Sequence, residues 1–455
     1  MKRFWHLLLI PIALCLVAAD PPGQQWPPQH AHYGPEPRQS TPGRPPEHIV
    51  PAEQAAVAKA RALGVRVSVG KDGHVVDITM GLDDFQKDDA MECISAFTET
   101  VEFTSWCCLY TDRGLAYLGR LRKLRKANIG SREITDEGLK GLQPLKNLEW
   151  LSIYGPKIRG PGLAYLGVLP KLQTLSIAST GVDKEGTKYL SGLTSLRRLS
   201  LGRGVTGEWL SPLRSLPGLE GISTCNELDG NCVKYFTPLK NLRNIPSLRN
   251  VRDDELTQLA SLQSLTGLSL PRCTASEAGY RELTRLRHLE GLGLSETNLE
   301  APSLEQVTKI DSLQFLWLES SHVSDGRLKN LSRLRELETL VLNKSNVHND
   351  AIKEIGQLPR LKHLELRLVK IDDDGLKWLA ASPSLEYLEL SDGGIGDRGL
   401  EYLAGVKTLK YLALYDTKVS QGGAERLHER REDLDFDIYT SDPSMEVIPF
   451  PEKKQ

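Results

Sequence analysis

Aromatic and charged side chains recur at alternate positions of several short apolar segments in the second half of the chain. They are Phe315, Trp317, His363, Glu365, Arg367, Tyr387, Tyr411 and Tyr415. Leucines occupy the positions between them, and this period of two predicts short strands with one buried and one exposed face. Exposed aromatic rings and arginine on rigid strands are typical of residues that dominate protein–protein contacts. These eight side chains are therefore our candidate partner-binding residues, and we expect them to recognise a partner through non-covalent contacts.

The arrangement of these strands decides whether the side chains act together. If neighbouring strands pair in register, Phe315, Thr339, His363, Tyr387 and Tyr411 form one row across a sheet. Trp150 and Tyr154 form a second, smaller aromatic pair. Two other interpretations stay open. Aromatic side chains suit strands for packing alone, and sugar rings can also stack on them, so a glycan is the alternative partner.

Signals of catalysis are missing from the sequence. It contains no Gly-rich phosphate loop, no paired-His zinc helix, no Gly-x-Ser-x-Gly elbow and no Cys-x-x-Cys pair. The frequent Asp residues before Gly are explained by turns and helix caps. The sequence therefore predicts a protein that is not an enzyme and has no catalytic residues, cofactor or metal site.

Seven cysteines raise the question of disulfides. In an oxidising compartment, Cys225 with Cys232 or Cys93 with Cys107 could form bridges. Cys108 and Cys273 occupy inward positions of their segments, which favours buried and unreactive thiols.

The N-terminus resembles an export signal. Lys2 and Arg3 precede an apolar stretch over 4–19 that ends in Val-Ala-Ala, which predicts a signal peptide at 1–19 with cleavage after Ala19. An uncleaved membrane anchor is the alternative, whereas Leu14 before Cys15 disfavours a lipoprotein. Residues 20–50 are rich in proline and polar residues and predict a disordered, extended linker. The expected location is exported: periplasm, cell surface or secreted, with no stable membrane span after cleavage.

The overall charge of the chain bears on whether it binds nucleic acid. Lys and Arg number 57 and Asp and Glu 59, a net charge of −2. A nucleic-acid binder normally carries a basic face, so no nucleic-acid partner is expected.

One internal repeat organises most of the sequence. The spacing Leu-x-x-Leu/Ile-x-Leu/Ile recurs almost every 24 residues, for example at Leu148-Leu151-Ile153 and Leu385-Leu388-Leu390, and the step is 23 residues between Leu196 and Leu265. Leucines three residues apart follow each strand, as in Leu139-Leu142-Leu145, and fit a short helix or 3₁₀ turn. Thr135 or Asp136 can cap such a helix. One repeat alone buries too little apolar surface to offset the entropy lost on folding, so the repeats must stack on one another.

The repeat resembles the leucine-rich repeat family, and in particular exported bacterial proteins with units of about 24 residues. The segments Ile134-Thr-Asp-Glu-Gly-Leu139 and Ile395-Gly-Asp-Arg-Gly-Leu400 carry the resemblance. It implies an α/β fold: a curved right-handed solenoid with parallel strands on the concave face and short helices on the convex face.

The domain boundaries follow from the repeat and its flanks. An N-terminal cap of a helix plus a hairpin strand is expected at 51–74, a solenoid of about fifteen units at 75–433, and a cap strand with a tail at 434–455. The predicted function is an exported repeat scaffold that binds another protein through its concave face. A carbohydrate-binding protein or a structural cell-envelope protein is the alternative.

Overall fold

The computed structural model describes residues 48–81, 87–391 and 394–439, which divide into two compact units. The first unit ends at Asn226 and the second begins at Glu227. The predicted signal peptide, the predicted linker up to residue 47 and the tail from residue 440 lie outside the described residues.

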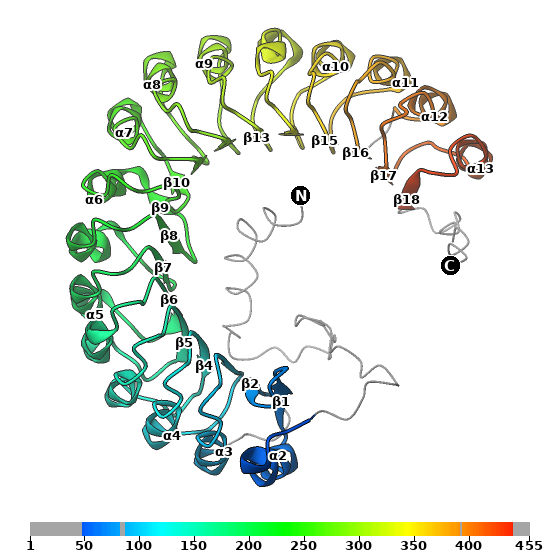
Figure 1. The fold of residues 1–455 in the computed structure, drawn as a ribbon. Helices are drawn as coiled ribbons and strands as arrows, with labels where there is room; N and C mark the ends of the chain where they lie inside the picture. The colour runs from blue at the N-terminus through cyan, green and yellow to red at the C-terminus, as the bar shows by residue number, and fades with distance from the viewer. Residues whose placement is uncertain (1–47, 82–86, 392–393, 440–455) are drawn as a thin grey trace, which may run out of the picture. The chain divides into compact units, whose positions relative to one another are not determined.

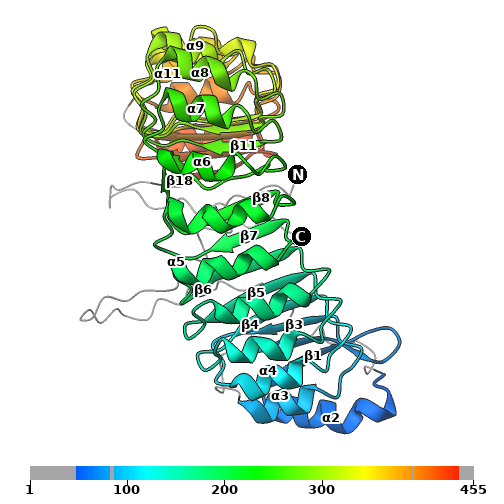
Figure 2. The same cartoon turned by 90° about the vertical axis from the view of Figure 1, so that its left-hand side faces the viewer.

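The first unit carries an eight-stranded sheet with helices along its outer side (Figure 1). The strands are β1 (Val65–Val69), β2 (Val75–Met80), β3 (Glu102–Ser105), β4 (Lys126–Gly130), β5 (Trp150–Gly155), β6 (Thr174–Thr180), β7 (Arg198–Leu201) and β8 (Gly221–Thr224). The α-helices are α2 (Pro51–Ala62), α3 (Asp88–Ile94), α4 (Asp112–Leu118) and α5 (Lys184–Thr187). The 3₁₀ helices are η1 (Glu137–Leu142), η2 (Pro161–Val168), η3 (Lys188–Gly192) and η4 (Gly207–Ser215). Figure 2 shows α3 and α4, which contact each other, side by side along this unit.

The second unit repeats this plan. Its strands are β9 (Leu228–Asp229), β10 (Leu248–Arg249), β11 (Gly267–Ser269), β12 (Gly291–Gly293), β13 (Phe315–Trp317), β14 (Thr339–Val341), β15 (His363–Leu366), β16 (Tyr387–Ser391), β17 (Tyr411–Tyr415) and β18 (Asp435–Tyr439). The α-helices are α6 (Val233–Phe236), α7 (Asp253–Leu259), α8 (Glu277–Leu283), α9 (Ala301–Val307), α10 (Asn349–Ile355), α11 (Asp373–Leu376), α12 (Asp397–Leu403) and α13 (Gln421–Arg430). The 3₁₀ helices are η5 (Gly230–Cys232), η6 (Asp325–Arg327) and η7 (Leu331–Arg333). Strands β11 to β18 form one sheet in sequence order, and β11 to β18 are all parallel.

The aliphatic positions of the repeat form the core. Leu148 and Leu151 from the strand segment and Leu139 and Leu142 from the helical segment are fully buried. Each such side chain contributes about 2 kcal/mol through removal of apolar surface from water. Because each unit presents leucines to both neighbours, burial is shared along the stack.

A carboxylate joins successive repeats at the start of their helices. Asp112 accepts hydrogen bonds from the backbone N–H (2.7 Å) and the hydroxyl (2.6 Å) of Thr135, 23 residues later. Asp136 likewise accepts from the backbone of the next repeat at Gly162 (2.8 Å), and it makes no cap hydrogen bond to its own helix. The local capping role predicted for Thr135 or Asp136 is therefore wrong at η1, since both side chains serve contacts between repeats.

The Gly of the Asp-x-Gly-Leu segment allows this close approach. A Cβ atom on Gly138 would lie 2.2 Å from Oδ1 of Asp112. The same geometry recurs 24 residues apart, where Gly399 lies against Asp373 and Gly423 against Asp397. Glycine is needed at these positions because any side chain would collide with the carboxylate of the preceding repeat.

The N-terminal end of the first sheet is an antiparallel hairpin. β1 pairs antiparallel with β2, whereas β2 pairs parallel with β3. Helix α2 covers 51–62, where the sequence predicts a helix, and packs against β1. The buried Glu53 of α2 accepts hydrogen bonds from the backbone N–H of Val75 (2.8 Å) and lies 2.9 Å from the ring of His74.

The predicted single ladder of strands is interrupted. β9 pairs only with β10, and they form a two-stranded sheet separate from β11–β18. The segment that should hold the next regular strand contains Pro246, and it forms only an isolated bridge between Asn244 and Gly267. Proline has no N–H to donate to a ladder, which accounts for the irregular pairing there.

The second sheet ends at β18, which pairs parallel with β17. Phe436 of β18 is buried, whereas Asp435 and Asp437 are exposed. Within the described ranges, no helix combines the length and the apolar character needed to cross a bilayer.

Candidate functional site

The predicted row of outward side chains is present on the second sheet. Phe315 is paired with Thr339, Thr339 with His363, His363 with Tyr387, and Tyr387 with Tyr411. We call these five residues the aromatic row. Neighbouring parallel strands lie about 4.8 Å apart, so side chains of adjacent strands touch along the row.

The rings divide into two groups. His363 stacks on Tyr387 with 4.1 Å between ring centroids, and Tyr387 stacks on Tyr411 at 5.0 Å. Phe315 cannot continue this column because Thr339, which has no ring, lies between it and His363. Phe315 instead stacks on Trp317 of its own strand, with centroids 5.9 Å apart and planes 12° apart.

A parallel row runs beside the aromatic row and carries the charge. It consists of Trp317, Val341, Glu365, Glu389, Ala413 and Asp437. We call it the acidic row. Three of its members are carboxylates, so ring edges and negative charge lie next to each other on β15 to β18.

Glu365 is held as an anion by its neighbours. The His363 ring nitrogen Nε2 lies 2.9 Å from Oε1, and Nδ2 of Asn343 donates to Oε2 at 2.9 Å. The hydrogen bond with His363 lowers the pKa of Glu365, against the opposing effect of burial. Asn343 also accepts from the backbone N–H of Arg367 at 2.8 Å, so one buried amide positions both charged residues.

Arg367 joins the carboxylates of Glu365 and Glu389 to an aromatic ring. Its Nε lies 3.3 Å from Oε1 of Glu389, and its Nη2 lies 3.8 Å from Oε2 of Glu365. The guanidinium carbon lies 6.0 Å from the ring centroid of Tyr415. Glu389 is only 6 % exposed and also accepts from the hydroxyl of Tyr387 at 3.2 Å. A guanidinium is thus bound between carboxylates and a ring.

The tyrosine hydroxyls of this surface remain protonated. Burial raises the pKa of Tyr387, and the nearby Glu389 carboxylate raises it further. Burial also raises the pKa of Tyr411, whose hydroxyl donates to Asp437. These phenols are therefore hydrogen-bond donors at neutral pH rather than bases.

Two residues of this surface were missed by the sequence reasoning. Tyr439 stacks on Tyr415 with centroids 4.7 Å apart and is 46 % exposed. The signal was available, because Tyr439 follows Tyr415 by one 24-residue step. Asn343 precedes Arg367 by the same step, but its bonds to the Glu365 carboxylate and the Arg367 backbone could not be inferred from spacing.

Comparisons with known proteins bear on the fold. A family model described as leucine-rich repeat matches residues 381–404. The crystal structure of an internalin from Listeria monocytogenes is similar over 75% of this chain and 95% of that one, with 20% identity and a TM-score of 0.51. The chain has a leucine-rich-repeat fold. A leucine-rich-repeat protein of Leptospira interrogans aligns with 76% of this chain and 80% of its own, at 19% identity and a TM-score of 0.45. No curated protein sequence matches significantly.

The remaining predicted aromatic pair lies in the first unit. Trp150 and Tyr154 are both on β5 and are half-buried. Trp150 is paired with Lys126 and Thr174, so no ring continues the pair along that row. These residues therefore do not join the aromatic row, which belongs to the second unit.

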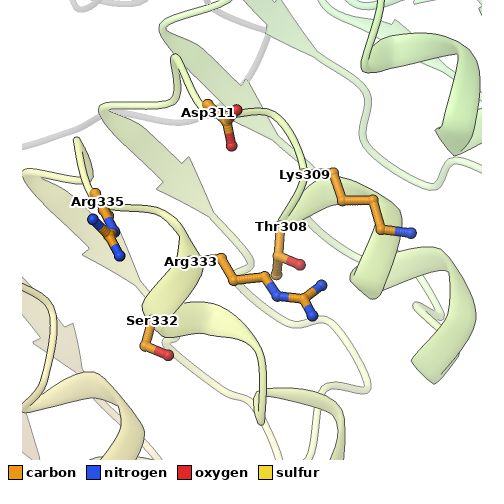
Figure 3. Close-up of a pocket in the computed structure, with 6 residues that line it drawn as sticks. All are labelled: Thr308, Lys309, Asp311, Ser332, Arg333 and Arg335. Carbon is orange, nitrogen blue, oxygen red and sulfur yellow. The ribbon is translucent and has the colours of Figure 1, made fainter.

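A hollow on the second unit was not predicted from the sequence. It measures about 540 Å³ and is lined by Thr308, Lys309, Asp311, Ser332, Arg333 and Arg335 (Figure 3). Lys309 and Arg333 lie 3.6 Å and 3.9 Å from the carboxylate of Glu305, which neutralises part of their charge. Its lining is polar and open, and it offers no apolar anchor for a ligand.

The two predicted bridges, Cys93–Cys107 and Cys225–Cys232, are not formed. Cys93 and Cys107 are free thiols, whereas Cys225 is disulfide-bonded. Cys108 and Cys273 are buried, as expected from their inward positions. Burial raises the pKa of Cys108 to about 11, which makes its thiol unreactive at neutral pH. Among the residues the structure covers, no group of three or more metal-ligating side chains is found.

Proposed function

We propose that this leucine-rich-repeat protein is a non-enzymatic, exported scaffold that binds another protein through the concave face of its second unit. The observation that supports this most is the in-register aromatic row next to the acidic row on β13 to β18. Rigid strands hold both rows, so little side-chain entropy is lost when a partner docks. Aromatic and arginine side chains in such a setting are typical binding hot spots.

The stacking geometry favours a protein over a glycan. Sugar rings bind against open faces of aromatic rings. Here His363, Tyr387 and Tyr411 cover each other's faces at 4.1 Å and 5.0 Å, and Tyr415 covers Tyr439 at 4.7 Å. Stacking covers at least one face of each of these five rings, and the hydroxyls and carboxylates beside them suit the side chains and backbone of a protein.

The experiment is an affinity capture with the full chain, quantified by mass spectrometry. The test variant carries Trp317→Ala and Tyr411→Ala. A matched control carries Trp378→Ala and Tyr402→Ala, two aromatic side chains outside the strands of the same unit. Loss of two hot-spot rings costs about 2 kcal/mol or more of binding free energy. The captured amount of any partner of the concave face should therefore fall at least about tenfold with the test variant but not with the control.

The outcomes separate the candidates. Partners that both variants retain equally would refute the concave face as the site. A glycan array distinguishes the alternative, because glycan signals that the same two substitutions abolish would favour carbohydrate. Absence of any partner that depends on these residues would leave a structural envelope component as the better hypothesis.

Export is the second part of the proposal. Its support is the charged and apolar segment at 1–19 followed by the proline-rich segment at 20–50. The non-enzymatic part rests on the absence of catalytic motifs in the sequence.

A further inference from the structure

The charges of the acidic row are not balanced toward its C-terminal end. On β15 to β18 the outward carboxylates include Glu365, Glu389 and Asp437. Arg367 lies between the first two. Asp437 is exposed and accepts from Tyr411, but it makes no ion pair with any residue that the structure describes.

The charges at the starts of these strands do not supply the missing cation. Lys362 lies 2.7 Å from Glu338, and Lys410 lies 2.8 Å from Glu386. Each lysine therefore already has its own carboxylate. The excess negative charge near Asp437 remains on the face where the exposed rings lie.

The protein itself contains an example of the ligand chemistry that this face accepts. The guanidinium of Arg367 sits over the ring of Tyr415 with a carboxylate of the acidic row at 3.3 Å. One position further along the sheet, Tyr439 stacks on Tyr415 and Asp437 occupies the acidic row. This second place offers the same pair of groups, a ring and a carboxylate, without a guanidinium of its own.

We propose that the partner docks a basic segment on β17 and β18, with a lysine or arginine side chain between Asp437 and the Tyr415–Tyr439 pair. The proposal rests on the protein-binding function proposed above and names the chemistry of the partner. Charge complementarity speeds association and excludes acidic competitors. The exposed ring of Tyr439 adds a cation–π contact, which is worth more where water is partly excluded.

Peptides of defined charge test this proposal with the full chain. The probes are fluorescein-labelled 12-residue peptides in which glycine alternates with lysine, glutamate or serine, followed by fluorescence anisotropy at low and physiological salt. The variants are Asp437→Asn, which keeps an acceptor for Tyr411, and Tyr439→Ala. The matched control, Asp374→Asn, removes an exposed carboxylate of α11 in the same unit.

We expect the lysine peptide alone to bind, more weakly as salt rises. Asp437→Asn and Tyr439→Ala should each raise the dissociation constant of the lysine peptide about fivefold, whereas Asp374→Asn should leave that constant unchanged. Equal binding of the serine or glutamate peptide would overturn the proposal, as would equal losses in Asp437→Asn and Asp374→Asn, or no binding of the lysine peptide. The capture experiment with Trp317 and Tyr411 has its own readout, so failure here does not decide the protein-binding function.

Discussion

The contact between Asp397 and Gly423 predicts a pair of substitutions whose effects do not add. Asp397 accepts from the backbone N–H of Ser420 at 2.7 Å, from its hydroxyl at 2.6 Å and from Arg426 at 2.9 Å. Hydrogen bonds to a charged group contribute about 1.5–3 kcal/mol each when buried. Because water can replace part of them at this half-exposed site, we expect Asp397→Ala to cost about 2 kcal/mol locally.

Gly423→Ala should destabilise the same contact by a different route. Its new methyl group would lie 2.2 Å from Oδ1 of Asp397, and the carboxylate cannot move away without losing its bonds to Ser420. We expect a cost of about 1–3 kcal/mol. Gly422→Ala is the matched control, because its nearest atom is the mobile end of Arg426 at 3.4 Å. In a helix that change should be neutral or slightly stabilising.

The double variant tests whether the collision with the Asp397 carboxylate is the reason that position 423 requires glycine. Without the carboxylate the methyl group has room, so Asp397→Ala combined with Gly423→Ala should cost about 1 kcal/mol less than the sum of the two. Hydrogen exchange of residues 420–427 is the assay, since stacked repeats open locally. A loss of about 2 kcal/mol corresponds to roughly thirtyfold faster exchange. Strict additivity, or equal effects of Gly422→Ala and Gly423→Ala, would refute the reasoning.

Three further predictions concern other parts of the chain. The hydrogen bond to Glu53 raises the pKa of His74. The positive charge of the protonated His74 ring therefore stabilises the folded state below pH 6.5, and this contribution is lost as the pH rises through the raised pKa. Hydrogen-exchange protection of β1 and β2, corrected for intrinsic rates, should fall over that range, and His74→Gln should remove the dependence. Ser320 has a left-handed backbone with φ of 55°, so Ser320→Gly should raise the free energy of unfolding by up to about 1 kcal/mol while Ser320→Val lowers it, as measured by denaturant titration. Mass spectrometry of the exported chain should find Asp20 as its first residue, and an intact Met1 would contradict the cleavage site.

The spacing of leucines made the repeat, the strands and their register predictable. Leu316, Leu340 and Leu364 must all face the core, and their strands can satisfy this only by pairing residue for residue. The aromatic row followed from that register without any knowledge of side-chain conformation. Sequence reasoning could not give the contacts between outward side chains, because several partners compete for each one. Arg367 could reach either neighbouring strand, and only the structure places it against Glu389.

The places where prediction was wrong have identifiable physical causes. Asp136 is a good helix cap by residue type, but its carboxylate accepts from the N–H groups of Gly160 and Gly162 in the next repeat and makes no cap bond to its own helix. The interruption near Pro246 was visible in the sequence as a residue without a donor, although the even spacing of leucines continued through it. The spacing of the leucines indicates which side chains are buried. Strand pairing also requires backbone N–H donors, which this spacing does not report.

The separation between core and outward positions makes the binding surface testable without loss of the fold. Leu316 and Leu318 are fully buried, while Trp317 between them is half-buried and stacks only on Phe315. Trp317→Ala therefore removes a surface contact, and lost binding reports recognition. Glu389 is different, because it is buried with Arg367 and Tyr387 around it. Its removal would leave Arg367 without its closest carboxylate and would cost stability, so the exposed residues are the ones whose substitution separates binding from folding.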